Sequence, residues 1–196
     1  KEMLGIIGAS SAGKTSLTLY YFKEILENSH NPNSACVFFS LEMTCQQVYE
    51  KWLMLVGEDS DLTNRLYVVE NCDENGKPRD LTTGGILNEC LKLRNGLGLD
   101  LAAIAIDHLQ IIATNGGNDN VNSICGRLKH VATELNTLVI VLTQALEKSL
   151  GATHCDVPLY KTDAYGCSGL NWYASWIISI HQPLQRVLHN TCPWRG

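Results

Sequence analysis

The sequence predicts an α/β fold: a mostly parallel, twisted sheet with helices on both faces and an antiparallel hairpin at one edge. Apolar runs of strand length alternate with amphipathic stretches, as in sheets that are covered on both sides. A glycine-containing loop directly follows the first apolar run and opens a helical pattern. Of the 196 residues, 45% are hydrophobic, which is enough for one large core. We therefore expect residues 1–196 to form a single domain.

Seven apolar runs predict strands, and four amphipathic stretches between them predict helices. The last two strands are separated by only three residues, 182–184, which is short enough for an antiparallel hairpin. The predicted strands are 3–7, 36–40, 66–70, 101–107, 138–143, 174–181 and 185–189, and the predicted helices are 14–27, 44–56, 81–94 and 121–136.

Two segments, 114–120 and 145–169, lack a clear period and contain glycine, which indicates loops. Each follows a predicted core strand. Ligands of open α/β sheets bind beyond the carboxyl ends of the strands, so both loops are candidates for substrate contact. Ordinary surface connections remain the alternative.

The loop after the first strand has the form G-x-x-x-x-G-K-T, which is typical of a site for a nucleoside triphosphate. Its backbone N–H groups surround the phosphates and the helix N-terminus adds partial positive charge. Lys14 reaches the β- and γ-phosphates, and Thr15 is a ligand for Mg²⁺. We expect ATP or GTP to bind here. The predicted binding residues are Gly8, Ala9, Ser10, Ser11, Ala12, Gly13, Lys14, Thr15 and Ser16.

Three polar residues lie at or just after the ends of later strands and are expected near the γ-phosphate. Glu42 can activate the attacking water, or it is only an acid favoured by the helix N-terminus that follows. Asp107 ends a strand whose preceding residues are a run of four or more apolar side chains. This is the Walker B pattern of a Mg²⁺-binding carboxylate. Gln144 can sense the γ-phosphate and pass the signal to the loop after it, or it merely ends its strand. Spacing leaves the alternatives for Glu42 and Gln144 open.

Charge and cysteine content narrow the function class. A net charge of −5 argues against a protein that coats nucleic acid with its whole surface, although residues 164–196 carry two arginines and no acid. The eight cysteines never form C-x-x-C, so we expect reduced, mostly buried thiols. The apolar runs are too short to span a membrane and no secretory leader is visible, which favours the cytoplasm, or a host's cytoplasm for a viral source. Because the chain begins shortly before the phosphate loop, we expect a fragment of a longer protein.

Four stretches, in this order and at these intervals, resemble the DnaB-family replicative helicases. They are 39–43 (F-S-L-E-M), 106–110 (I-D-H-L-Q), 126–136 and 139–144 (V-I-V-L-T-Q). The resemblance spans nearly the whole chain, is strongest over 8–43 and 98–144, and is weak over 145–163.

The resemblance implies a RecA-like P-loop NTPase core that assembles into a ring, usually a homohexamer, around single-stranded DNA. ATP and Mg²⁺ would lie between subunits, with Glu42 as the catalytic carboxylate, Asp107 as the Walker B acid and Gln144 as the sensor. A primase and a helicase loader are implied as further partners. The segment that would offer backbone N–H groups to DNA phosphates is Gly166, Cys167, Ser168 and Gly169.

The chain departs from the family pattern near its end. The family carries a Lys-x-Arg pair that reaches the neighbour's ATP site; here Arg195 is kept as the arginine finger, but Pro193 replaces the lysine. The aromatic group of Trp172, Tyr173 and Trp176 invites base stacking, but at this spacing core packing is the commoner role. A RecA/RadA-type recombinase and a KaiC-like ATPase that does not translocate are the alternative functions.

Overall fold

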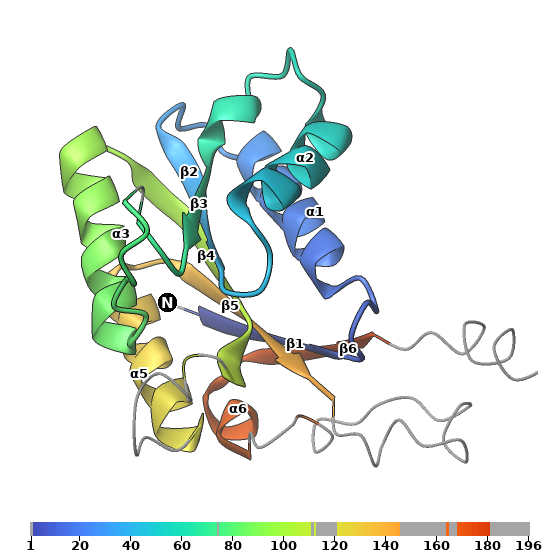
Figure 1. Ribbon diagram of the computed structural model, residues 1–196, viewed down its shortest axis with the longest axis vertical. Coiled ribbons are helices and arrows are strands. Elements are labelled where there is room, and N and C mark those ends of the chain that lie inside the picture. The colour runs from blue at the N-terminus through green and yellow to red at the C-terminus, as the bar shows by residue number, and fades with distance from the viewer. Residues whose placement is uncertain are drawn as a thin grey trace, which may run out of the picture.

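The computed structural model describes residues 2–73, 75–110, 112, 121–145, 164 and 168–180. Its centre is a six-stranded sheet in the order β3-β2-β4-β5-β1-β6, and every pair of neighbouring strands is parallel (Figure 1). The strands are β1 (Glu2–Gly8), β2 (Ser34–Ser40), β3 (Leu66–Glu70), β4 (Asp100–Asp107), β5 (Leu138–Gln144) and β6 (Trp176–Ile180).

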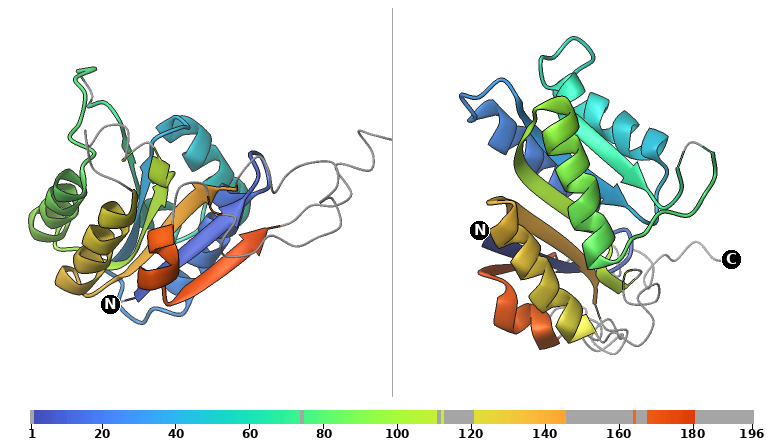
Figure 2. Two further views of the ribbon diagram at one scale, coloured as in Figure 1. Left: turned by 90° about the horizontal axis from the view of Figure 1, so that it is seen from below. Right: turned by 90° about the vertical axis from the view of Figure 1, so that its left-hand side faces the viewer.

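Helices cover both faces of the sheet (Figures 1 and 2). The side chains of α1 and α2 pack on one face, where Phe22 and Trp52 are fully buried. Those of α3, α5 and α6 pack on the other, through residues such as Ile86, Leu128 and Leu170. The helices are α1 (Lys14–Glu27), α2 (Cys45–Val56), α3 (Thr83–Leu97), α5 (Val121–Glu134) and α6 (Ser168–Tyr173), with a 3₁₀ turn at η1 (Thr63–Arg65).

Burial on both faces explains why the strands are continuously apolar. Successive side chains of a strand point to opposite faces, and in β4 Ala103 and Ala105 join the core under α1 and α2. Ile104 and Ile106 of the same strand join the core under α3 and α5. Small residues on one face and branched residues on the other therefore both remain buried.

Polar side chains cap the N-termini of α2 and α3. The Thr44 hydroxyl accepts from the Gln47 N–H, while the Gln47 side chain accepts from the Thr44 N–H, so α2 begins with a complete capping box. At α3 the Thr82 hydroxyl accepts from the Gly85 N–H. The capping box fixes where α2 begins, shortly after the candidate catalytic glutamate.

The predicted α/β class, the parallel sheet and the helices on both faces are confirmed. No antiparallel hairpin occurs between the strands that the structure describes: β6 pairs in parallel with β1, and the expected strand 185–189 lies outside the described residues. The segment 174–181 was expected to be a strand throughout, but its strand begins at Trp176. The reason is that α6 ends immediately before it, with the Ala174 N–H donating to the Leu170 carbonyl. The short helix α6 was not predicted.

Two findings bear on the compositional expectations. Cys36, Cys45, Cys72 and Cys90 are free thiols, and burial raises the pKa of Cys90 to about 12. Such a thiol is protonated at neutral pH and unreactive. None of the helices in the described ranges combines the length and hydropathy that a membrane span requires.

Candidate functional site

The carboxyl ends of β1, β2, β4 and β5 surround a pocket of about 380 Å³. The phosphate loop and the start of α1 line it with residues 10, 11 and 13–16. Glu42, Asp107 and Gln144 each reach it from another strand end, as the sequence predicted. Met43, the last residue of the F-S-L-E-M stretch, and Lys51 also line it, although neither was predicted as a site residue.

The phosphate loop has a backbone that its glycines make possible. Gly13 has a φ of +94°, in the left-handed region that glycine tolerates best, while a Cβ there would meet nothing within 4 Å. The constraint at Gly13 is therefore conformational rather than steric. The Gly13 carbonyl accepts from the Leu17 N–H at 2.9 Å, so α1 begins directly at the loop. The N–H groups of the first turn of α1 would thus be available to a phosphate bound in the loop.

Lys14 folds over the loop that it follows. Its Nζ donates to the carbonyls of Gly8 at 3.1 Å and Ala9 at 2.7 Å, and the residue is only 8% exposed. Burial lowers the pKa of Lys14, and the nearby carboxylates of Asp107 and Glu42 oppose that shift. The ammonium is thus held at the mouth of the loop, where phosphate oxygens would be its natural partners.

Thr15 and Asp107, the predicted Mg²⁺ ligands, are joined by a hydrogen bond in the pocket. The Thr15 hydroxyl donates to Oδ2 of Asp107 at 2.7 Å, and Asp107 is 5% exposed. Burial raises the pKa of Asp107, while the hydrogen bond from Thr15 lowers it. A hydroxyl and a carboxylate oxygen are hard donors of the kind that Mg²⁺ prefers, so this pair fits the expected ion.

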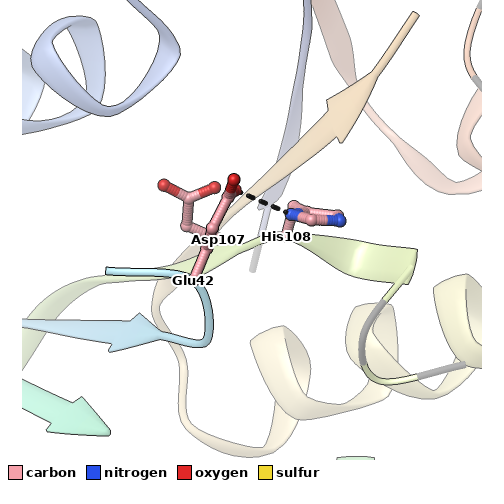
Figure 3. Close-up of side chains that lie close together, drawn as sticks. All are labelled: Glu42, Asp107 and His108. Carbon is pink, nitrogen blue, oxygen red and sulfur yellow. Dashed lines mark ion pairs between the residues drawn. The ribbon is translucent and has the colours of Figure 1, made fainter. Parts of the chain in front are cut away.

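Glu42 lies beside this pair because the ends of two strands are joined. The Leu41 N–H donates to the Asp107 carbonyl at 2.9 Å, which brings the residue after β2 next to the end of β4. Oε2 of Glu42 lies 3.3 Å from Nδ1 of His108 (Figure 3). The ligand atoms of Glu42, Asp107 and His108 all lie within 4.8 Å of one another. The Glu42 side chain is 54% exposed, so water can reach its carboxylate.

Gln144 ends β5 directly opposite Gly8, the first residue of the phosphate loop. The Ala145 N–H donates to the Gly8 carbonyl at 3.1 Å, which extends this pairing by one residue. Beside Gln144, the buried Thr143 hydroxyl accepts from Nε2 of Gln110 at 2.7 Å. Gln110, which follows Asp107, is therefore tied to β5, and spacing alone did not reveal this link between two motifs.

The predicted DNA-contact segment is described only in part. Gly166 and Cys167 lie outside the described residues, as does Arg195. Ser168 opens α6, and the buried Gly169 donates its N–H to Oδ1 of Asn122 on α5 at 2.5 Å. A Cβ at Gly169 would come within 2.6 Å of the Asn122 backbone, so this close approach requires glycine.

The expectation that the aromatic group packs in the core is wrong. Trp172 is 83% exposed, Trp176 59% and Tyr173 42%. The reason is that α6 contacts the core through Leu170, which leaves Trp172 on its outer side, while Trp176 lies on the edge strand β6. Tyr173 packs over Gly126, where an added Cβ would meet its ring at 3.1 Å.

Comparisons with known proteins support the fold. No protein-family model matches the sequence, and no curated protein sequence matches it significantly. Among solved structures, the chain is similar to the ATPase domain of a DnaB-family phage helicase, with a TM-score of 0.73 and 17% sequence identity. The match covers 99% of this chain and 72% of that one. The core is therefore RecA-like, as the sequence resemblance implied, and at this identity the likeness shows the fold alone.

Proposed function

We propose that this chain is the ATPase motor domain of a DnaB-family replicative helicase. One observation carries the proposal: Lys14, Thr15, Glu42, Asp107 and Gln144, predicted from separate motifs, line a single pocket. A RecA-like core supports nucleotide hydrolysis in general, and the four sequence stretches named above favour the helicase family within it.

In this proposal ATP binds with its β- and γ-phosphates in the loop, where a bound Mg²⁺ ion would supply positive charge to the phosphate oxygens. Lys14 exchanges its two carbonyl partners for phosphate oxygens. The Thr15 hydroxyl and the Asp107 carboxylate would hold the ion. Glu42 accepts a proton from the attacking water, and its exposed carboxylate, next to the buried Asp107, suits that role.

The proposed site is completed by a second subunit. Arg195, from the adjoining copy in a homohexameric ring, is the candidate arginine finger, and Pro193 leaves it without the family's neighbouring lysine. An arginine supplied across an interface can raise the rate roughly 10³- to 10⁵-fold. The isolated subunit should therefore hydrolyse ATP slowly. A primase and a helicase loader would bind the assembled ring in the cytoplasm.

Single-stranded DNA is the proposed polymer substrate, held by backbone groups of residues 166–169. Because the Gly169 N–H already donates to Asn122, the contact is assigned mainly to Gly166, Cys167 and Ser168. Contacts to phosphates release counterions, so affinity should fall steeply with added salt.

The net charge of −5 favours one alternative, a KaiC-like ATPase that assembles without moving along DNA. ATP turnover with and without single-stranded DNA at low salt separates the two. A helicase motor should be stimulated by DNA, form rings and, in the full-length protein, displace a strand from a forked duplex. Lys14→Ala should lose these activities together. Turnover that is indifferent to DNA would favour the alternative, and open filaments in electron micrographs would favour a RecA/RadA-type recombinase.

A further inference from the structure

An imidazole and two carboxylates gather beyond the ends of β2 and β4 (Figure 3). One ligand atom each from Glu42, Asp107 and His108 lies within 4.8 Å of the other two. Glu42 follows β2, while Asp107 ends β4 and His108 is the next residue, and the parallel pairing of the two strands keeps these ends together. We call the three residues the carboxylate–imidazole cluster.

The ring nitrogen Nδ1 of His108 is buried and has no hydrogen-bond partner among the residues that the structure describes. Oε2 of Glu42 lies 3.3 Å away, yet the two atoms do not form a hydrogen bond. A buried polar atom without a partner costs free energy, and a bound ion or water is the usual explanation for one. An imidazole nitrogen and carboxylate oxygens that face a common point fit a cation bound between them.

The donor set of this cluster differs from that of the proposed Mg²⁺ site. Thr15 and Asp107 offer only oxygen atoms, which Mg²⁺ prefers, whereas His108 adds a nitrogen. One imidazole with two carboxylates suits Zn²⁺ and related transition-metal ions, and three protein ligands leave a fourth position for water. The Glu42 side chain is 54% exposed and lines the phosphate pocket, so an ion can enter from solvent.

We propose that the carboxylate–imidazole cluster binds a transition-metal ion of the Zn²⁺ class, and that this ion inhibits ATP hydrolysis. The inhibitory role rests on the proposed function, in which Glu42 accepts a proton from the attacking water. A Glu42 oxygen that coordinates the metal has its lone pair engaged, so it is a poorer acceptor for that proton. Metal binding itself does not depend on the proposed function, because it needs no nucleotide.

The metal site is tested on the full chain without nucleotide. Co²⁺, which substitutes for Zn²⁺ and absorbs visible light, is titrated into the protein, and Zn²⁺ is then added to displace it. His108→Asn should weaken the binding of both ions at least roughly tenfold, since even the loss of a group that only orients a metal ligand costs that much. Glu42→Gln, at an exposed side chain, should weaken them as well. His130→Asn, at an exposed histidine on α5, is the matched control and should bind both ions as the wild type does.

Metal binding at another place has its own spectrum. Cys45 is an exposed free thiol, and a thiolate bound to Co²⁺ gives a strong near-ultraviolet band that nitrogen and oxygen ligands do not give. Equal affinities of the wild type and His108→Asn would overturn the proposed metal site, and that band would then assign the ion to thiols. The space beside Nδ1 of His108 would in that case hold water.

The inhibitory role is tested by ATP turnover at saturating Mg²⁺ and ATP, with the free Zn²⁺ concentration fixed by a chelator buffer. The wild type and His130→Asn should lose turnover as Zn²⁺ binds, while His108→Asn should need at least roughly tenfold more free Zn²⁺ for the same inhibition. Inhibition of all three at the same free Zn²⁺ would contradict this role. A chain that binds Co²⁺ and Zn²⁺ as expected but neither binds nor hydrolyses ATP would overturn the proposed function and the inhibitory role, and would leave the metal site in place.

Discussion

The Thr15 hydroxyl donates a 2.7 Å hydrogen bond to the Asp107 carboxylate, although the two residues lie 92 positions apart. The contact joins the first turn of α1 to the end of β4. It brings together two oxygen ligands for the proposed Mg²⁺ ion. One of them belongs to Asp107, which is almost completely buried.

Replacing Thr15 tests this contact directly. Thr15→Val keeps the shape of the side chain but removes the oxygen, so Mg²⁺-dependent ATP turnover should fall by roughly 10- to 100-fold. Thr15→Ser keeps the hydroxyl and should retain most of the rate. Steady-state turnover over a range of Mg²⁺ concentrations measures the effect. Equal rates for Thr15→Val and Thr15→Ser would show that the hydroxyl is not a ligand.

Removing the charge of Glu42 tests its assignment as the base. Glu42→Gln should lower kcat by about 10²- to 10⁴-fold, because the water loses its proton acceptor. ATP affinity should change little, since the carboxylate is not needed to hold the phosphates. Glu50→Gln, an exposed acid on α2, is the control. The assignment fails if Glu42→Gln turns over ATP at the wild-type rate.

The buried Asp107 should make stability depend on pH. Because burial raises its pKa, the folded protein binds this proton more readily than the unfolded chain does. The free energy of unfolding should then decrease as pH rises through the interval between the ordinary pKa of about 3.9 and the raised value. Above that interval Asp107 is charged in both states, so the free energy of unfolding is lowered by the full cost of burying the charge.

Asp107→Asn removes this cost. In the presence of excess EDTA, the variant should have a higher Tm than wild type at pH 7, by about 2–4 °C for each kcal/mol gained. The difference should disappear below about pH 4, where the aspartate is protonated in both states. Thermal melts across this pH range measure it. A less stable variant at pH 7 would mean that the Thr15 hydrogen bond outweighs burial.

Trp52 of α2 packs in the core between the sheet and the helices α1 and α2. It is fully buried, and its indole N–H donates to the Leu62 carbonyl at 3.3 Å. Trp52→Ala should lower the free energy of unfolding by about 3–5 kcal/mol, measured by urea titration. The exposed Trp172→Ala should stay within about 0.5 kcal/mol of wild type. Similar losses for the two variants would contradict the burial that the structure assigns to them.

Several features follow from local sequence. The phosphate loop is recognised from its glycines, and Gly13 has the positive φ that the loop requires. The strands are recognised as apolar runs such as β4, whose side chains are mostly buried. Because the carboxyl ends of parallel strands meet at one edge of a sheet, motif order was enough to predict that Lys14, Glu42, Asp107 and Gln144 converge.

Other features depended on residues that are distant in the chain. Helix α6 was not predicted, because six residues with no charge carry little periodic signal and its position is set by Leu170 packing on the core. The exposure of Trp172 follows from that packing. The spacing of the aromatic residues suggested burial, which was wrong.

The sequence by itself determined the α/β class and the residue types of the proposed phosphate site, because both depend on the local spacing and hydropathy of residues. Only the tertiary structure decided that Gln110 holds Thr143 and that His108 lies against Glu42. The physical reason is that such contacts depend on how whole helices and strands pack together. The local sequence does not determine which residues from distant parts of the chain come into contact.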